Sequence, residues 1–338
     1  MSARILCFGE LLLRLSSPGR ELLLQTPRLA VQVGGAEANV AIALAAFGHA
    51  TGCITQVADN ALGRAAVGEL RRHGVDTTRV RYRPGRMGLY FLETGALQRP
   101  SEVLYDRAGS AFATADPASY DWPELLHGVD CLHLSGVTPA LGPACAATAI
   151  AAARAARSAG IQVIFDGNFR ATLWRAWDGD PADILGALLA CADMVFADHR
   201  DIGIVLRRDF SAMPAERRER VAADAAFAAF PQIRRIVSTH RQQHSVDCHD
   251  LSAHCYGREQ DWHIPAQRLD GIVDRIGGGD AFAAGVLHGL FSGFDDEHSL
   301  RFGLAAACLK HSIPGDALAI GADRVEQAIG AARFDVRR

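Results

Sequence analysis

The sequence predicts an α/β fold built around a mainly parallel sheet, with a second and smaller β-sheet beside it. Short apolar runs alternate along the chain with long alanine-rich helical patterns, and this alternation is typical of βα repeats. Two segments, 11–33 and 87–110, interrupt it with an apolar–polar alternation that has no helical period. We expect these two segments to form one small sheet that lies as a lid over a crevice in the main sheet.

The elements of the main sheet follow in order from the apolar runs. The expected strands are Ile5–Phe8, Thr51–Val57, Cys131–Leu134, Val163–Asp166, Met194–Ala197 and Arg235–Ser238. The expected helices between them include Glu37–Phe47, Leu62–His73, Pro143–Ala159, Ala182–Cys191 and Glu216–Phe230. Glycines follow three of these helices, where helix C-caps are expected: Gly48, Gly74 and Gly160. We therefore expect the whole chain, 1–338, to be a single domain into which the lid segments are inserted.

Composition and charge limit the classes of partner. The 338 residues include 35 Lys and Arg against 38 Asp and Glu, so the net charge is −3. This charge offers no basic surplus for nucleic acid or an anionic membrane. The longest strictly apolar run, Val40–Phe47, is far shorter than the roughly 18 residues that a membrane span needs. We expect a soluble, cytoplasmic protein with neither partner.

Several common catalytic and binding motifs are absent from the sequence. It has no Walker-type phosphate loop, no Gly-x-Ser-x-Gly nucleophile elbow, and no Gly-x-Gly-x-x-Gly turn after the first expected strand. The densest polar cluster extends from His244 to Cys255 and contains three His and two Cys. Its spacing matches no usual zinc pattern, and short strands joined by a turn explain it as well. Whether this cluster binds a metal stays open at this point.

One segment, Asp274-Arg-Ile-Gly-Gly-Gly-Asp280, combines glycines with a carboxylate directly before a helix of small residues. Backbone N–H groups of glycines at a helix N-terminus favour a bound anion, phosphate above all. An aspartate beside that anion can accept the proton of a hydroxyl group, as phosphoryl transfer to an alcohol requires. The alternative is a purely structural glycine turn in which Asp280 caps the helix.

A second glycine pair and two arginines are further candidates for ligand contacts. Gly34 and Gly35 open the helix that carries Asn39, although an ordinary turn and cap would have the same sequence. Arg107 and Arg170 lie near the ends of strand-like segments, where their planar guanidinium groups suit a carboxylate ligand. The alternative is a surface arginine or an arginine paired with an aspartate, and Arg170 stands four residues after Asp166.

Taken together, these segments resemble the two signatures of the ribokinase-like (PfkB-type) carbohydrate kinases. The signatures correspond to Gly34-Gly-Ala-Glu-Ala-Asn-Val-Ala41 and to Asp274-Arg-Ile-Gly-Gly-Gly-Asp280. Within that family the sequence is most similar to 2-keto-3-deoxygluconate kinases. Stretches that carry this likeness include Gly9–Ser16, Gly88–Glu93, Tyr105–Ala111, Phe165–Arg170 and Lys310–Asp316. The likeness extends over nearly the whole chain.

The resemblance implies a three-layer α/β/α sandwich with a β-sheet lid that commonly also serves as a dimer surface. It implies ATP and Mg²⁺ as cofactors, and transfer of phosphate to the terminal (6-) hydroxyl of 2-keto-3-deoxygluconate. Asp280 matches the catalytic base, and Gly277, Gly278 and Gly279 match the anion hole. Residues that match the sugar-acid site are Gly34, Gly35, Asn39, Tyr90, Tyr105, Arg107 and Arg170. Asp198, Ser238, Gly277, Gly279 and His311 are expected at the ATP.

The sequence departs from the family pattern in two places. The Asn-x-x-Glu that helps to order Mg²⁺ is Asp198-His-Arg-Asp201 here, so Asp198 and Asp201 are the expected, indirect magnesium residues. After the strand at 235–238, a polar Ser238–Ser245 segment stands in place of a glycine-rich turn, which predicts altered nucleotide contacts. Alternatives are a kinase of a neutral sugar such as fructose, or a sensor that kept the fold without turnover. The sequence leaves open the preferred epimer and the oligomer size.

Overall fold

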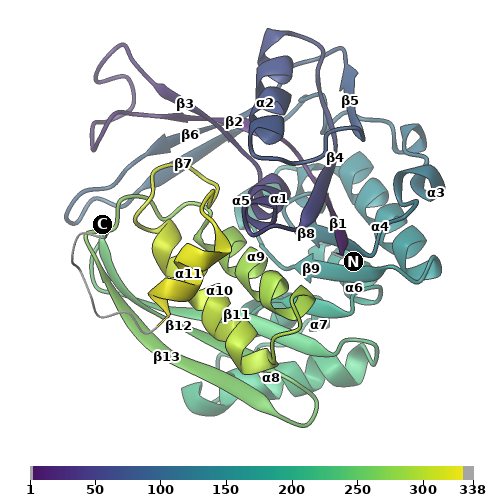
Figure 1. Ribbon diagram of the computed structural model, residues 1–338, viewed down its shortest axis with the longest axis vertical. Coiled ribbons are helices and arrows are strands. Elements are labelled where there is room, and N and C mark those ends of the chain that lie inside the picture. Colours follow the sequence, from purple (N-terminus) through teal and green to yellow (C-terminus); the bar gives the residue numbers. More distant parts are fainter. Residues whose placement is uncertain (1–2, 330–338) are drawn as a thin grey trace.

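The computed structural model describes residues 3–329 and contains two β-sheets (Figure 1). The larger sheet has nine strands in the order β13-β12-β11-β10-β9-β8-β1-β4-β5, and the smaller sheet has four in the order β3-β2-β6-β7. The strands from β5 to β11 pair in parallel, whereas β11, β12 and β13 form an antiparallel edge. The predicted α/β fold with a mainly parallel sheet and a second small sheet is confirmed.

The strands of the large sheet are short and lie close to the predicted apolar runs. They are β1 (Arg4–Phe8), β4 (Ala50–Ala58), β5 (Val80–Arg83), β8 (Cys131–Ser135), β9 (Gln162–Asp166), β10 (Met194–Phe196), β11 (Arg235–Gln243), β12 (Cys248–Tyr256) and β13 (Asp261–Asp270). β1, β8 and β9 are almost wholly buried, as expected for strands with helices on both faces.

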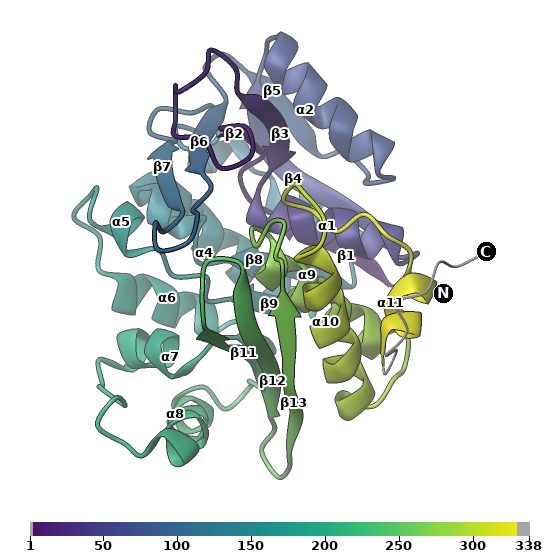
Figure 2. The ribbon, with the colours of Figure 1, turned by 90° about the vertical axis from the view of Figure 1, so that its left-hand side faces the viewer.

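Helices cover both faces of the large sheet (Figure 2). One apolar core lies under α1 (Ala36–Ala46), α2 (Ala61–Arg72), α9 (Gly278–Phe291), α10 (Asp296–Lys310) and α11 (Ala322–Ala328). A second core fills the other face, under α3 (Trp122–Leu125), α4 (Pro143–Ser158), α5 (Ala171–Trp174), α6 (Pro181–Leu189), α7 (His199–Leu206) and α8 (Ala215–Ala229). The sheet and these two helical layers make the three-layer α/β/α sandwich.

The small sheet combines the two segments that lacked a helical period. Its strands are β2 (Leu12–Ser16), β3 (Ala30–Gly34), β6 (Gly88–Glu93) and β7 (Glu102–Asp106). In the register of these strands, Arg14 stands opposite Tyr90, and Tyr90 stands opposite Tyr105. Because directly opposed residues share a face of a sheet, these three side chains leave the sheet on the same side.

The expected end of the strand at residue 238 is wrong. β11 continues to Gln243 and forms an antiparallel pair with β12, so the polar segment after Ser238 is part of a hairpin. The cluster from His244 to Cys255 occupies the turn and β12 of the same hairpin, as the alternative of short strands joined by a turn predicts.

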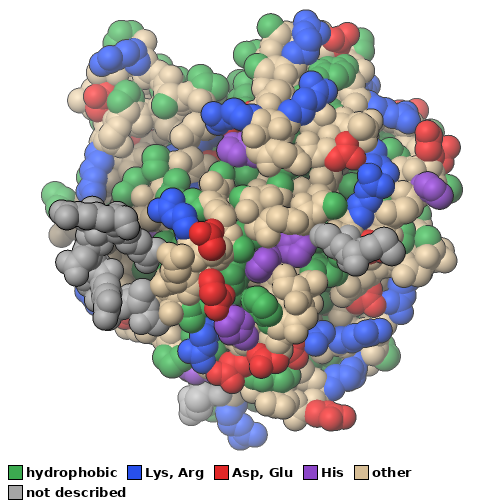
Figure 3. Space-filling model, viewed as in Figure 1, with side chains coloured by type: hydrophobic (Ala, Val, Ile, Leu, Met, Phe, Trp, Pro, Cys, Tyr) green, Lys and Arg blue, Asp and Glu red, His purple; other side chains and the backbone are tan. Residues whose placement is uncertain are grey.

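The surface drawn in Figure 3 carries Lys and Arg side chains interspersed with Asp and Glu side chains. This mixture accords with a net charge of −3. Within residues 3–329, none of the helices has both the length and the apolar character that crossing a membrane requires.

Candidate active site

The predicted site residues gather at the carboxyl ends of the parallel strands, under the small sheet. β9 ends at Asp166 and β10 is followed by Asp198, while Asp280 and Asn39 come from helices that begin at this edge. The strand order runs outward in both directions from β1 and β8, and a crevice at such a reversal is the usual ligand site of an open α/β sheet. A cavity of about 520 Å³ lies here.

Asp280 faces this cavity as the third residue of α9. α9 is capped by Gly277, whose φ of +76° favours glycine, and no side chain bonds its N-terminus. The carboxylate of Asp280 instead accepts a hydrogen bond of 2.7 Å from Nδ2 of Asn39. The alternative in which Asp280 caps the helix is therefore wrong, and the two signature segments meet at this bond.

Burial raises the pKa of Asp280 to about 7, although the hydrogen bond from Asn39 and the charge of Arg170 act to lower it. A general base with a pKa near the working pH combines enough ionised form with enough basicity. The carboxylate of Asp280 thus combines a pKa suited to accepting a proton with a place in the cavity wall.

The glycines of the two signatures also meet at Asp316. A Cβ on Gly34 would lie 2.2 Å from Oδ2 of Asp316, and a Cβ on Gly277 would lie 1.7 Å from its backbone oxygen. Both positions therefore exclude a larger side chain. Of the two predicted glycines of the first signature, Gly35 lines the cavity, while Gly34 packs behind it against Asp316.

A buried ionic network fixes the small sheet over the cavity. Nη1 of Arg14 donates to Asp274 at 2.7 Å and to Asp316 at 2.8 Å, and the hydroxyl of Tyr90 donates to Asp316 at 2.6 Å. Tyr90 and Tyr105 line the cavity beside this network. Sequence analysis did not assign Arg14 or Asp316 a role, although an arginine inside the apolar run Leu-Leu-Leu-Arg-Leu is a signal for a buried ion pair.

The two arginines predicted to grip a carboxylate have different surroundings. Arg107 is 6% exposed, and its Nε donates to Oε2 of Glu10 at 2.6 Å. Arg170 is exposed, and its Nη1 donates to the carbonyl of Phe169 at 3.1 Å. Among residues 3–329, no carboxylate lies within ion-pair distance of Arg170, so the alternative pairing with Asp166 is not formed. Both arginines line the same cavity.

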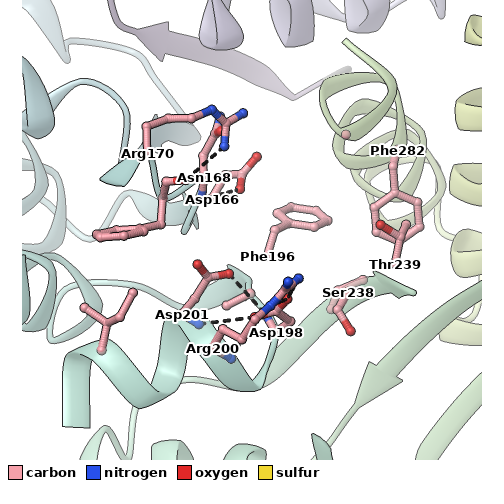
Figure 4. Close-up of a pocket in the computed structure, with 15 residues that line it drawn as sticks. Asp166, Asn168, Arg170, Phe196, Asp198, Arg200, Asp201, Ser238, Thr239 and Phe282 are labelled. Atoms are coloured by element: carbon pink, nitrogen blue, oxygen red, sulfur yellow. Dashed lines mark hydrogen bonds and ion pairs between the residues drawn. The ribbon is translucent and has the colours of Figure 1, made fainter. Parts of the chain in front are cut away.

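A second cavity of about 430 Å³ adjoins the first and is drawn in Figure 4. Asp198 lines it but is already engaged: it accepts from the backbone N–H of Arg200 at 2.8 Å and of Asp201 at 3.2 Å, and it pairs with the guanidinium of Arg200. Although burial opposes the change, the hydrogen bonds from Arg200 lower the pKa of Asp198. Asp198 therefore acts first as the N-cap of α7.

Asp201 and Asp166 are the carboxylates of this cavity that lack an ion pair within the described chain. Burial raises the pKa of Asp201 to about 6, with a further contribution from the charge of Asp198. Burial raises the pKa of Asp166 to about 8, and the carboxylates of Asp280 and Asp201 add to the shift. Such carboxylates are disposed to accept a cation.

A third cavity of about 700 Å³ lies on the far side of the glycine loop. Four of the five residues predicted at the ATP line it: Asp198, Ser238, Gly279 and His311. The fifth, Gly277, lines the first cavity instead. The ring of His311 packs on Gly278, where a Cβ would lie 2.8 Å from Cε1 of the ring. Gly279 lines all three cavities, so the glycine loop stands at their junction.

The fold and the three cavities, which meet at a glycine loop beside a carboxylate, fit a sugar kinase. The family model described as pfkB family carbohydrate kinase matches residues 2–320. The chain therefore belongs to the pfkB family of carbohydrate kinases.

Individual relatives are similar over nearly the full length. A 2-dehydro-3-deoxygalactonokinase from Haloferax volcanii is 33% identical over 330 residues, which cover 97% of each chain. A 2-dehydro-3-deoxygluconokinase from Bacillus subtilis is 26% identical over 84% of this chain and 82% of the relative. The crystal structure of 2-dehydro-3-deoxygluconokinase from Thermotoga maritima has a TM-score of 0.91 and 34% identity, covering 97% of this chain and all of that one. The chain is thus a sugar kinase close to the 2-dehydro-3-deoxy-sugar kinases.

Proposed function

We propose that this kinase transfers the γ-phosphate of ATP to the terminal (6-) hydroxyl of a 2-keto-3-deoxy sugar acid, with 2-keto-3-deoxygluconate as the first candidate. The observation that carries the proposal is the exposed guanidinium of Arg170, which lines the same cavity as Asp280 and whose one hydrogen bond within the described chain goes to a backbone carbonyl. A sugar acid would offer this guanidinium a carboxylate that can accept two parallel hydrogen bonds, which a neutral sugar lacks.

In the proposed reaction, Asp280 accepts the proton of the sugar's terminal hydroxyl. The hydroxyl oxygen forms a bond to the γ-phosphorus, the bond from that phosphorus to the bridging oxygen breaks, and ADP leaves with the electron pair. The N–H groups at Gly277, Gly278 and Gly279 stabilise the charge on the transferring group. Asn39 holds the Asp280 carboxylate through its 2.7 Å hydrogen bond.

The walls of the first cavity support an acidic sugar as the substrate. Tyr90, Tyr105, Arg107 and Arg170 line it together with Asp280 and Gly279. Arg170 is the residue assigned to the substrate carboxylate. Arg107 contributes its charge beside the sugar, while its Nε is occupied by Glu10. The relatives are named for both the galactonate and the gluconate series, so the epimer is part of the experiment below.

The residues present fit a magnesium ion bound together with ATP. Asp201 and Asp166 offer oxygen ligands with no ion pair in the described chain, whereas Asp198 is occupied by Arg200. Within residues 3–329, no three His, Cys, Asp or Glu side chains are arranged to hold a metal by themselves. ATP phosphates and water would therefore complete the shell, as Mg²⁺ prefers. Bound there, Mg²⁺ would neutralise phosphate charge during transfer.

The small sheet supports the proposal of a homodimer formed through this surface. On its outer side, Val31, Leu15, Phe91 and Leu104 stand in one row across all four strands. Val31 is 59% exposed and Leu104 is 57% exposed. An apolar row on an open sheet face favours association with a second copy. Sedimentation of the wild type and of Val31→Asp/Leu104→Asp tests this proposal, and a monomeric wild type would contradict it.

A coupled assay of ADP release tests the proposed function. ATP and Mg²⁺ are supplied with 2-keto-3-deoxygluconate, its galactonate epimer, fructose and ribose. We expect kcat/KM for one or both sugar acids to exceed that for the neutral sugars by at least tenfold. A preference for a neutral sugar would replace the proposal with the fructose-type alternative. Binding of ATP without turnover of any sugar would favour the sensor.

A further inference from the structure

Two arginines at the junction of the compartments are not explained by the site described above. Arg241 lies on β11 and Arg275 lies two residues before Gly277. Both line the first cavity, which contains Asp280, and the third cavity, which contains His311. They therefore lie, with Gly278 and Gly279, at the boundary between these two cavities.

The charges of Arg241 and Arg275 have no partner in the part of the chain that the structure describes. Neither side chain makes a hydrogen bond, an ion pair or a ring contact within residues 3–329, whereas the nearby Arg200 is paired with Asp198. Burial and the neighbouring charges of Arg275 and Arg200 lower the pKa of Arg241. Like charges brought together without a counterion are costly unless a ligand supplies the negative charge.

We propose that Arg241 and Arg275 bind the γ-phosphate of ATP at the glycine loop and hold it during transfer to the sugar. This inference rests on the proposed function and adds two catalytic residues to it. Guanidinium groups suit phosphate because their planar N–H groups can bond two oxygens at once. The continuation of β11 to Gln243 is what brings Arg241 to the junction, where the family pattern has a glycine-rich turn.

The first test measures nucleotide binding and needs no sugar. Calorimetry gives Kd for ATP and for ADP, each with Mg²⁺, for the wild type and for Arg241→Met and Arg275→Met. We expect the wild type to prefer ATP, and each variant to lose roughly tenfold or more of that preference while its Kd for ADP changes little. Arg268→Met is the matched control, since Arg268 is half exposed on β13 and lines none of the three cavities.

The second test measures turnover of the best sugar from the assay above. We expect kcat to fall by roughly tenfold to 150-fold in each methionine variant, and Arg241→Lys to recover part of it. Melting temperatures of the ligand-free variants should not fall below the wild-type value, because neither arginine has a partner in the described chain and each substitution removes an uncompensated charge. Because the γ-phosphate is common to the reactions of all the sugars, we expect kcat to fall to the same extent for each of them.

Three results would overturn the inference. An unchanged ratio of ATP to ADP affinity in both variants would remove the arginines from the γ-phosphate. A loss confined to sugar acids would assign them to the substrate carboxylate. A lowered melting temperature, with no rescue of kcat by Arg241→Lys or Arg275→Lys, would make them structural. If the wild type turns over no sugar, the proposed function fails, and the binding ratio still decides the inference.

Discussion

The two arginines that the sequence assigned to one task differ in almost every physical respect. Arg107, at the end of the small sheet, is 6% exposed and bonded to the carboxylate of Glu10, which is 2% exposed. Arg170, after β9 of the large sheet, is exposed and bonds only a neighbouring carbonyl. The guanidinium of Arg107 is held by an ion pair within the protein, whereas that of Arg170 has no carboxylate within ion-pair distance in the described chain.

The same contrast extends to the carboxylates on the two sides of the cavity. On the small-sheet side, Asp274 and Asp316 are paired with Arg14. On the large-sheet side, Asp166, Asp201 and Asp280 make no ion pair with the residues that the structure describes, and the pKa of each is raised, first by burial. Charged side chains that are paired with each other hold the cavity wall in one arrangement, whereas unpaired carboxylates can bind a cation or a proton. The carboxylates under the small sheet are therefore held by the protein itself, whereas those near the strand ends of the large sheet have no ion pair within the described chain.

On the large-sheet side of the site, the largest effect is expected for the substitution Asp280→Asn. The amide keeps the shape of the side chain but removes the proton acceptor, so we expect kcat to fall by about two to four orders of magnitude with little change in KM. Steady-state kinetics with the preferred sugar measures the effect, and the melting temperature serves as the control for folding. A kcat equal to that of the wild type would exclude Asp280 as the base.

On the small-sheet side, where the charges are paired, the largest effect is expected for the substitution Arg107→Ala. Removing one partner leaves the Glu10 carboxylate buried without its ion pair, so we expect the free energy of unfolding to fall by about 3–5 kcal/mol. Activity should fall for every sugar alike. The double variant Arg107→Met/Glu10→Gln should regain much of the stability because neither member of this ion pair remains as an unpaired charge. Chemical denaturation measures both, and an unchanged stability in Arg107→Ala would contradict the contrast between the two sides.

Arg170→Ala should show the opposite pattern. Because Arg170 has no ion pair within residues 3–329, we expect the melting temperature to stay near the wild-type value. If Arg170 binds the substrate carboxylate, kcat/KM for the sugar acid should fall by roughly tenfold to 150-fold. Residual activity on a neutral sugar should fall less, and Arg170→Lys should recover only part of the loss. An equal loss on both classes of sugar would remove Arg170 from acid recognition.

The pH dependence gives the smallest and most specific effect. Asp280 must be ionised to act as a base and its pKa is raised to about 7, so kcat/KM should rise with pH up to about that value. Asn39→Ala removes a hydrogen bond that favours the ionised carboxylate, so the rising limb should move to higher pH. A limb that moves to lower pH, or does not move, would show that Asn39 does not act on Asp280.

The raised pKa of Asp280 also has a consequence for stability. The folded protein binds this proton more tightly than the unfolded chain does. The contribution of Asp280 to the free energy of unfolding therefore falls as pH rises from the ordinary range of a carboxyl group, about 4, to about 7. Thermal melts of the wild type and of Asp280→Asn across this range measure the difference, which should shrink toward the acidic end.

Local sequence determined the alternation of strands and helices, the two sheets, and the glycine segments of the site. Apolar runs and helical periods arise from neighbouring residues, so β1, β8 and β9 begin and end close to their predicted bounds. The glycines at 277–279 and the carboxylate at Asp280 were predictable for the same reason, since an anion-binding turn before a helix is a local motif.

Only the tertiary structure decided which charges are satisfied. The partner of Arg14 is Asp274, 260 residues away, and that of Arg107 is Glu10, 97 residues away. No local pattern encodes such a pairing, because it depends on which strand ends the topology brings together. Arg241 and Arg275 could not be predicted from the sequence for the same reason. A lone arginine is usually a surface residue, and only the three-dimensional structure shows that both line the same two cavities. The sequence by itself determined the glycine segment and its carboxylate, because both belong to one local motif. The packing of the two sheets decided which charged side chains are paired within the protein and which are not.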